Sequence, residues 1–562
     1  MKNTMTATKT NAFINAVNFL TETTRSENGA LKLASTGSAL VDQFGKAGNY
    51  RHREIADVFE DQARIWDENS ELALRFPFYL RMVTRKIKVN DELTTEKVQN
   101  GQGARDESFK RLLWVAKNHS TEFYNNLWVL AVVGSWKDMW TIMHYDIEYG
   151  VNTIDRTKVY DVIGQGLLCN AHVELVKKFM PRIKSMSKCN TEWTKNTNMF
   201  AKEFAKYMEL SYQDYNKLKA SGTAHTFQKL ICSQKYDELK WNMIPGRALN
   251  LLVTSKFLTN HSLKENYTKW ILEQPVAKFT GYAFELSKKL RQGNYIGWYN
   301  SNKEIPIEIK HTLDAQFNQL IETAKANGKI TQNVWVGLDT SGSMNCSVAG
   351  LKDTSCSDIA TSLALFFASM NTGAFHNKII MFDDTSTPFD MKGESFCDRI
   401  TALPRVGCGG TNFQSIVDEI IKIRKKNPNI PLEEYPTTIL VVSDMQFNPT
   451  SYRWLYEHDS RADREELNYE YSKNALKTVF PSDFVDNMKF IWWDCASKHT
   501  DYEGKATDTN CMFVSGFDGS IMNMLLNEDS DIDESTKEIR KLTAEEMVEK
   551  ALSQEILTYV NL

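Results

Sequence analysis

Hydroxyl and carboxylate side chains gather at three points in the second half of the sequence. They are Asp339, Ser341 and Ser343 in Asp339-Thr340-Ser341-Gly342-Ser343, Thr411 in Gly409-Gly410-Thr411-Asn412, and Asp444 after Val442-Ser443. Together they offer two carboxylates and three hydroxyls. Hard oxygen ligands with little formal charge suit Mg²⁺ that keeps some of its waters. A Ser/Gly turn without metal is the alternative interpretation.

Short apolar runs indicate the strands that position these ligands. The runs are continuous rather than alternating, which is typical of strands buried on both faces of a parallel sheet; they lie at 334–338, 379–382, 438–442, 490–493 and 512–514. Helix-like stretches lie between them, at 358–370, 413–425 and 465–479. This alternation predicts a doubly wound α/β domain with a parallel sheet. Because the loops at the carboxyl ends of parallel strands converge, we expect the three ligand segments to meet there.

The chain from about residue 10 to 325 has helical periodicity instead. Apolar residues recur three and four apart, as in Phe200, Phe204 and Tyr207, and short polar or Gly/Pro segments separate the stretches. We find no clean repeat, yet a run of helical hairpins favours an α-solenoid of the HEAT type over an irregular helical domain. Pro77 predicts a helix that starts late or kinks.

The last residues carry two further signals. The acidic stretch 528–534 predicts a solvated linker. Thr543-Ala544-Glu545-Glu546 is a capping box, which predicts a final helix that packs back on the chain.

The formal net charge of −4 conceals two halves of opposite sign. Residues 1–330 hold 46 lysines and arginines against 35 acids, whereas residues 331–562 hold 21 against 36. Residues 1–150 are balanced, and the surplus falls in 151–300, with 23 basic residues against 12 acids. This split predicts two modules with different partners, and opposite signs would also help the halves dock.

Basic side chains in the middle segment are candidates for phosphate contact. Lys195, Lys202 and Lys206 share one face of a predicted helix, with Phe200, Phe204 and Tyr207 mainly on another face toward a core. A second cluster precedes them: Lys177, Lys178, Arg182, Lys184 and Lys188. Such residues would bind RNA in a salt-dependent, largely sequence-independent manner. A solvated basic face is the alternative.

Several function classes are not expected. No apolar run approaches the ~20 residues of a membrane span, and the polar first 20 residues do not look like a secretory signal. The nine cysteines form no CxxC pair, which argues against a zinc site or a disulfide framework and for a reducing, cytoplasmic location. There is no nucleophile elbow, HExxH pattern or paired-carboxylate signature, so we do not expect an enzyme.

The ligand pattern resembles the metal-ion-dependent adhesion site of the von Willebrand factor A fold, which consists of DxSxS, a distant Thr and a further Asp. By that resemblance Ser341 and Ser343 would ligate Mg²⁺ directly, Thr411 matches the second loop, and Asp339 and Asp444 would act directly or through water. The family leaves one coordination position open for an acidic side chain of a partner. The resemblance therefore implies an adhesive or structural metal.

A helical half followed by such a domain resembles the TROVE family, typified by the Ro autoantigen, and more closely a related uncharacterised domain-of-unknown-function family. The resemblance spans roughly residues 28–527, and the segments that carry it are Gly101–Asp106, Gly134–Asp138, Trp241–Ala248, Val442–Phe447 and Gly516–Asp518. It implies a closed helical ring, sealed by the A-domain, that receives single-stranded RNA ends inside and structured small RNA on an outer basic face. Arg105, Lys137 and Arg247, which lie in these segments, join the RNA-binding candidates, although capping or pairing with a carboxylate is an equal role for Arg105. Trp136 and Trp241 are expected in the core.

The sequence thus predicts three parts: a TROVE-like helical-repeat domain at 10–330, a von Willebrand factor A-like domain at 331–527, and an acidic linker with a C-terminal helix at 528–562. The predicted function is Ro-like RNA binding in a ribonucleoprotein, with a Mg²⁺-bound A-domain that closes the ring or recruits an acidic protein ligand. The alternatives are a metal-dependent protein-interaction scaffold without RNA and a structural particle component.

Overall fold

The structure is a computed structural model, and it describes residues 23–50, 53–87, 97–223, 226–296, 303–326, 330, 332–348, 350–403, 409–450, 466–496, 501–519, 530–532 and 539–562. The first 20 residues and the expected boundaries at residues 10, 331, 527 and 528 lie outside these ranges, as does the expected helix start at 465.

The first half of the chain is helical, as predicted. Its helices are α2 (Ala39–Ala47), α3 (Ile55–Glu68), α4 (Ser70–Arg81), α5 (Arg105–Asn118), α6 (Ser120–Val133), α7 (Lys137–Glu148), α8 (Arg156–Leu168), α9 (Val173–Phe179), α10 (Glu192–Tyr207), α11 (Tyr212–Ser221), α12 (Phe227–Cys232), α13 (Gly246–Thr254), α14 (Phe257–Asn260), α15 (Lys264–Leu272), α16 (Ala283–Gln292) and α17 (Ile307–Lys325). Two short hairpins accompany them: β1 (Thr23–Arg25) with β2 (Leu31–Leu33), and β3 (Val83–Ile87) with β4 (Lys97–Gln102). The HEAT-type repeat stays a prediction.

Pro77 lies inside α4 without delaying its start. The helix begins after Asn69, whose side chain accepts a hydrogen bond from the Leu72 amide at 3.0 Å, so the predicted late start is wrong. Proline has no N–H, which leaves the carbonyl of Ala73 without its partner one turn later in the helix. Gln62 of α3 donates to that carbonyl at 2.9 Å. A neighbouring helix therefore compensates for the proline, and α4 continues to Arg81.

The second half contains a six-stranded sheet. Its strands are β5 (Val334–Asp339), β6 (Lys378–Phe382), β7 (Ser386–Asp390), β8 (Thr438–Ser443), β9 (Lys489–Asp494) and β10 (Cys511–Ser515), in the order β10-β9-β8-β5-β6-β7. Neighbours are parallel except β6 and β7, which are antiparallel. The sequence predicted a wholly parallel sheet. That prediction is wrong at one edge, where β7 runs antiparallel to β6. The helices of this half are α18 (Cys356–Met370), α19 (Phe396–Ala402), α20 (Gln414–Lys426), α21 (Asn468–Leu476), α22 (Ser482–Asn487) and α24 (Ala544–Leu552).

Alternate residues of the central strands enter two different apolar cores. Val336, Leu440 and Ile491 join the core that continues into the helical half, whereas their neighbours Trp335 and Ile439 face the opposite side, beneath α20 and α21. Both faces of the sheet are thus buried, as the continuous apolar runs predicted.

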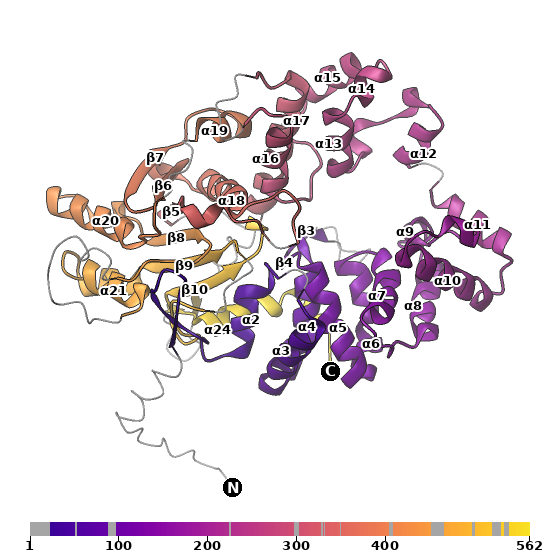
Figure 1. Ribbon diagram of the computed structural model, residues 1–562, viewed down its shortest axis with the longest axis horizontal. Helices are drawn as coiled ribbons and strands as arrows, with labels where there is room; N and C mark the ends of the chain where they lie inside the picture. The colour runs from indigo at the N-terminus through magenta and orange to yellow at the C-terminus, as the bar shows by residue number, and fades with distance from the viewer. Residues whose placement is uncertain are drawn as a thin grey trace, which may run out of the picture.

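The helices form an arc whose two ends rest on the α/β half. Figure 1 shows the chain leading away from the sheet through α11, returning through α12–α15 and reaching the sheet again at α16 and α17. At one end α2 contacts β10, and at the other α16 contacts α18 while α17 contacts α19. Among the described residues no helix is long and apolar enough to cross a membrane.

Opposite charges meet where the halves join. Arg291 of α16 pairs with Asp358 of α18 at 2.6 Å, and Lys310 of α17 pairs with Asp398 of α19 at the same distance. In both pairs the helical half supplies the base and the α/β half supplies the acid. This is the arrangement that the split in net charge predicts.

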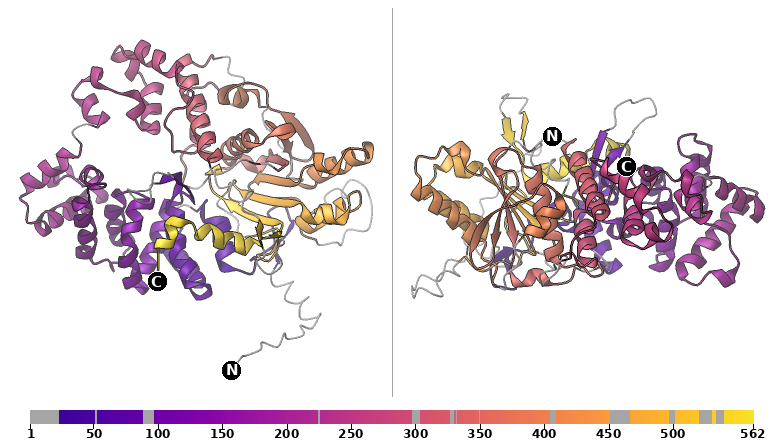
Figure 2. Two further views of the ribbon diagram at one scale, coloured as in Figure 1. Left: turned by 180° about the vertical axis from the view of Figure 1, so that it is seen from behind. Right: turned by 90° about the horizontal axis from the view of Figure 1, so that it is seen from above.

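The C-terminal segment returns to the first helices, as predicted. Thr543 caps α24 with a complete capping box, and α24 contacts α2 and α4. Figure 2 shows this final helix alongside the first helices of the chain. The acidic stretch before it is not wholly a linker, since β11 (Ser530–Ile532) pairs with β12 (Ile539–Lys541).

Candidate functional site

The sheet brings the predicted oxygen ligands to one edge. Strands β5 and β8 are parallel neighbours, with Leu338 opposite Val442, so Asp339 and Asp444 leave the sheet at the same end. The Ser443 hydroxyl donates to Asp339 Oδ2, and the Ser341 amide donates to Asp339 Oδ1 at 2.9 Å. Both carboxyl groups are buried.

The three hydroxyls lie on loops around these carboxylates. The Oγ atoms of Ser341 and Ser343 are 3.2 Å apart. Thr411 is buried just before α20, and its carbonyl accepts a hydrogen bond from the Asn448 amide at 2.8 Å. Asn448 follows Asp444 on the same loop, so the Thr411 and Asp444 segments are tied together.

The electrostatics of this cluster suit a cation. Burial, and next the negative charge of Asp444, raise the pKa of Asp339 to about 7. Within the described ranges Asp339 forms no ion pair with a lysine or arginine, and no group of three or more His, Cys, Asp or Glu side chains is placed to hold a metal. The available donors are two buried carboxylates and three hydroxyls, of which Ser341 and Thr411 are buried and Ser343 is half-buried, and this set of oxygens fits a hard divalent cation.

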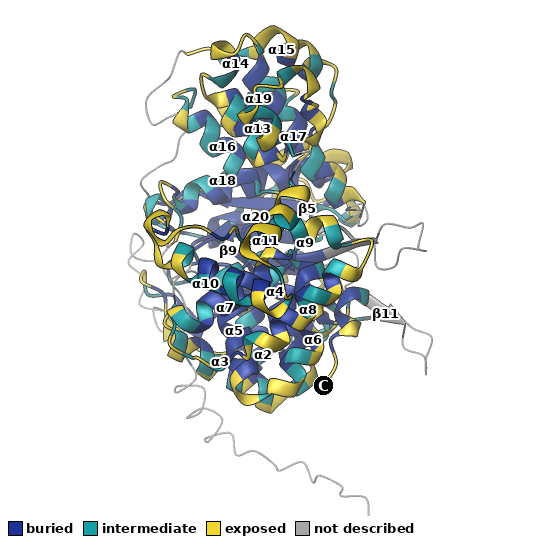
Figure 3. Cartoon of the chain, turned by 90° about the vertical axis from the view of Figure 1, so that its right-hand side faces the viewer, coloured by how far each residue is buried: buried dark blue, intermediate teal, exposed yellow. Residues whose placement is uncertain are grey.

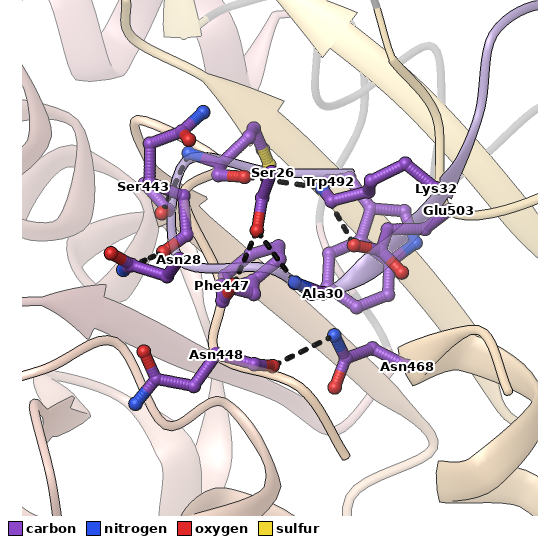
Figure 4. A network of polar contacts seen from close by, with 12 residues as sticks. Ser26, Asn28, Ala30, Lys32, Ser443, Phe447, Asn448, Asn468, Trp492 and Glu503 are labelled. Carbon is purple, nitrogen blue, oxygen red and sulfur yellow. Dashed lines mark hydrogen bonds and ion pairs between the residues drawn. The ribbon is translucent and has the colours of Figure 1, made fainter. Parts of the chain in front are cut away.

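A turn from the far N-terminus also reaches this edge, and the motif search missed it. Figure 4 shows residues 26–32 beside the loop that follows β8. Ser26 Oγ donates to the Phe447 carbonyl at 2.6 Å, and Asn28 Nδ2 donates to the Gln446 carbonyl at 2.5 Å and lies 3.4 Å from Thr411 Oγ1. Asn28 thus sits at the threonine of the candidate site, although it is more than 380 residues away in sequence. No local pattern around Asn28 signals this role.

A buried ion pair anchors the N-terminal turn. Lys32 Nζ lies 2.7 Å from Glu503 Oε1, with both side chains 1% exposed, and donates to the Met445 carbonyl at 3.1 Å. Burial opposes the charge of Lys32, but attraction to Glu503 and Asp501 outweighs it and raises the pKa of Lys32. Met445 directly follows Asp444 and has φ of 63°, a left-handed conformation that costs a non-glycine residue roughly 1 kcal/mol. Lys32 therefore helps to hold the backbone beside a candidate ligand.

Lys46 of α2 is the second buried cation near this edge. Its ammonium lies 3.9 Å from the ring centre of Tyr502. Burial outweighs attraction to Asp42, Asp501 and Asp494 and lowers the pKa of Lys46 to about 8. The charged form is thus less favourable in the folded protein than in the unfolded chain.

Lys46 should make stability increase with pH above about 8. Between the folded pKa of about 8 and the ordinary value of 10.5, the unfolded chain binds the proton more tightly than the folded one, so deprotonation favours folding. We expect Lys46→Met to raise the free energy of unfolding by about 3 kcal/mol at neutral pH. The difference in the free energy of unfolding between the variant and the wild type should become smaller as the pH rises from about 8. Urea unfolding of both proteins across this pH range measures the difference. A difference that does not change with pH would contradict the lowered pKa of Lys46.

A second cluster, at the start of α5 and α7, holds two of the predicted RNA-binding residues. Gly103, with φ of 66°, makes the turn before Arg105, and Asp138 accepts a hydrogen bond from the Ser135 amide at 2.8 Å beside Lys137. Both glycine-containing motifs thus set where a helix begins.

Arg105 and Lys137 lie close enough for their charges to interact. Burial, and next the positive charge of Arg105, lower the pKa of Lys137. Neither cation forms an ion pair with a carboxylate of the described residues, and Lys137 lies 5.3 Å from the ring centre of half-buried Trp193, on α10. Trp193 also packs edge-on against His144, at 4.8 Å between ring centres. We name Arg105, Lys137 and Trp193 the cation–indole cluster; the sequence search had not singled out Trp193.

The other basic candidates differ in their surroundings. Three are paired: Lys177 with Glu174 at 2.9 Å, Lys195 with Glu192 at 2.7 Å, and Arg247 with Glu285 through two contacts. The rest lie on α9, on α10 or on the loop between them, where Arg182, Lys184, Lys188 and Lys206 are exposed and Lys178 and Lys202 are half-buried. Figure 3 shows these helices with many exposed residues.

The aromatic predictions are mostly confirmed. Phe200 and Phe204 are buried in the core, and so are Trp136 and Trp241. Tyr207 is 40% exposed, because its hydroxyl reaches out to Asp161 of α8, so its predicted core position is wrong.

Comparison with known proteins gives similarity without a function. A family described as "Domain of unknown function (DUF7788)" matches residues 336–559, a range that includes all five candidate ligands and α24. The chain is also similar to "Uncharacterized protein L728" of Acanthamoeba polyphaga mimivirus, with 19% identity over 540 residues that cover 89% of this chain and 84% of the relative. The similarity to the mimivirus protein therefore extends through both halves.

Proposed function

We propose that this protein binds RNA through its helical half, with the cation–indole cluster as the contact for an unpaired nucleotide. The observation that carries the proposal is that Arg105 and Lys137 lie near enough for their positive charges to interact, that neither forms an ion pair with a described carboxylate, and that Lys137 lies 5.3 Å from the Trp193 ring centre. A phosphate bound between them would relieve their repulsion, because an anion stabilises two like positive charges. The indole of Trp193 beside them offers a stacking surface for a base.

The exposed basic residues of α9, α10 and the loop between them extend this surface. Arg182, Lys184 and Lys188 lie in one short loop and form no ion pair with a described carboxylate. They would follow the RNA backbone, whereas Lys177, Lys195 and Arg247 are partly neutralised by their own glutamates. In this proposal the protein acts in the cytoplasm as a Ro-like binding protein rather than an enzyme.

The oxygen cluster on the sheet supports a second, associated role. We propose that Asp339, Ser341, Ser343, Thr411 and Asp444 hold Mg²⁺. A bound Mg²⁺ would supply an electrophilic centre that attracts a carboxylate of a protein partner. Asn28 lies at the edge of this site, so the N-terminal turn would limit the directions from which a partner approaches.

Reversing the charges of Arg105 and Lys137 tests the RNA proposal. We expect R105E/K137E to weaken binding of a fluorescein-labelled oligouridine by about 30-fold at low salt, and to make the slope of log affinity against log salt shallower by roughly 1.4. Fluorescence anisotropy measures both quantities. Trp193→Ala should weaken the free energy of RNA binding by about 1–3 kcal/mol. Because this variant changes no charge, the slope of log affinity against log salt should stay the same.

Two matched variants locate the surface. K217E/K235E removes exposed lysines of the helical half that pair with Asp214 and Glu238, and we expect it to retain nearly full affinity. K195E/K202E/K206E probes the α10 face. If that triple variant loses binding while R105E/K137E retains it, RNA lies on α10 and the cation–indole cluster is not the site. Absence of binding by the wild-type protein would refute the function itself.

A further inference from the structure

Two cysteines beside the candidate metal loop are placed to react with each other. The Sγ atoms of Cys346 and Cys356 are 3.4 Å apart, and neither cysteine is in a disulfide in the structure. Cys346 ends the turn that carries Ser341 and Ser343, and Cys356 is the first residue of α18. The pair therefore joins the ligand loop to the helix that packs against β5, β6 and β8.

The backbone holds the two cysteines in the geometry of a disulfide. Ser347 and Ser355 form an antiparallel bridge, and the Cys356 amide donates to the Cys346 carbonyl at 3.1 Å, so the two cysteines are opposite one another. Opposed residues of this kind have Cα atoms roughly 5.5 Å apart, within the roughly 4.4–6.8 Å that a disulfide spans. The sulfur atoms would need to approach by only about 1.4 Å to form the bond.

We infer that Cys346 and Cys356 form a reversible disulfide that clamps the Ser341–Ser343 loop to α18. The oxidant that forms this disulfide is a peroxide, and hydrogen peroxide represents it in the experiments below. This inference needs neither the metal nor the RNA of the proposed function. Nothing in the sequence pattern suggested it, since the cysteines are ten residues apart and outside any CxxC motif.

The reaction proceeds in two balanced steps. The thiolate of half-buried Cys346 attacks a peroxide oxygen, the O–O bond breaks, and hydroxide leaves and takes up the thiol proton as water. The Cys356 sulfur then attacks the resulting sulfenic sulfur, the S–O bond breaks, and a second water leaves with the Cys356 proton. Two thiols are oxidised and one peroxide is reduced to two waters.

The surroundings assign the order of attack. Cys346 is half-buried, whereas Cys356 is buried. The hydrogen bond with Cys346 lowers the pKa of Cys356, but the hydrogen bond with Cys495 and burial outweigh it and raise that pKa. Because Cys346 is the more exposed of the two thiols, a peroxide reaches it first, which makes Cys346 the nucleophile and Cys356 the resolving thiol.

Oxidation would act on the ligand loop through one short connection. The Cys346 amide donates to the Ser343 carbonyl at 2.9 Å, so a bond at Cys346 restrains the backbone of Ser343. The ten-residue loop closed by the disulfide also loses conformational freedom in the opened state. Both effects should slow opening of residues 341–347.

Peptide mapping of the full chain tests the crosslink. The folded protein is treated with a small excess of hydrogen peroxide, blocked with iodoacetamide and digested with trypsin, which cleaves after Lys352 between the two cysteines. We expect peptides 330–352 and 353–378 to be joined, with the loss of two hydrogens, and to separate after dithiothreitol. Alkylation of both cysteines, or a crosslink from Cys356 to Cys495 instead, would overturn the inference.

Variants and hydrogen exchange test the clamp. Cys356→Ser should leave a sulfenic acid on Cys346 that dimedone labels, whereas Cys397→Ser, which alters a buried cysteine on α19, should crosslink as the wild type does. Exchange of the amides at 341–347 should slow at least threefold on oxidation of the wild type and remain unchanged in Cys356→Ser. A crosslinked protein with unchanged exchange would refute the clamp.

Discussion

Replacing Asp339 by asparagine should lower the affinity for Mn²⁺, used as a paramagnetic substitute for Mg²⁺, by about 100-fold or more. Loss of a group that only orients a ligand costs 10–100-fold in typical metal sites, and Asp339 stands at the centre of this one. Its two oxygens accept hydrogen bonds from Ser341 and Ser443, and asparagine retains only one of these two acceptors, so the substitution also weakens the contacts that hold the ligand loop. Titration of free Mn²⁺ by electron paramagnetic resonance measures the affinity directly.

The matched control for this experiment is Asp390→Asn. Asp390 is an exposed acid on edge strand β7, where it pairs with Lys378 at 3.2 Å. We expect that variant to bind Mn²⁺ like the wild type, and circular dichroism should show both variants folded. Equal Mn²⁺ affinity of Asp339→Asn and wild type, or no binding by either, would refute the metal site while leaving the RNA proposal standing.

Removing Lys32 should have the largest effect on stability. The Lys32→Met variant leaves Glu503 buried without its cation, and breaking a buried pair in this way costs about 3–5 kcal/mol. It also removes the donor to the Met445 carbonyl beside Asp444. We therefore expect a destabilised sheet edge, measured as a lower urea midpoint and as earlier proteolytic cleavage of residues 23–33.

A double variant separates the charge from the packing. Lys32→Met with Glu503→Gln removes both charges, so most of the lost stability should return. Lys378→Met breaks an exposed ion pair with Asp390 and should change the free energy of unfolding by less than about 1 kcal/mol. If Lys32→Met were as stable as Lys378→Met, the N-terminal turn would not be anchored by this pair.

The strands of the α/β half could be predicted because their composition reflects burial on both faces. Each run of three to five apolar residues needs a core on both faces of its strand, and the structure supplies these two cores on opposite sides of the sheet. Strand β7 could not be found in this way. It is an edge strand with exposed residues and contains Pro388, so its hydrogen bonds to β6, not its composition, place it in the sheet.

The candidate site was predictable where its residues follow strands and not where they come from afar. Asp339 and Asp444 end neighbouring parallel strands, and that topology alone brings them together. Asn28 lies in a polar turn whose partners are more than 380 residues away, and Trp193 joins Arg105 and Lys137 only through helix packing. Contacts of this kind leave no spacing in the sequence that a pattern search can detect.

The return of the C-terminal segment to the first helices has a consequence for synthesis. Asn126 of α6 exchanges two hydrogen bonds with the backbone of Asn561, and the Val560 carbonyl accepts one from Arg75 of α4. During translation α4 and α6 leave the ribosome more than 400 residues before these partners do. Until residues 544–561 have emerged, the surface of α4 and α6 that they cover stays open, so this packing forms late in synthesis. Release of residues 544–561, rather than completion of the helices themselves, would set the time at which the fold closes.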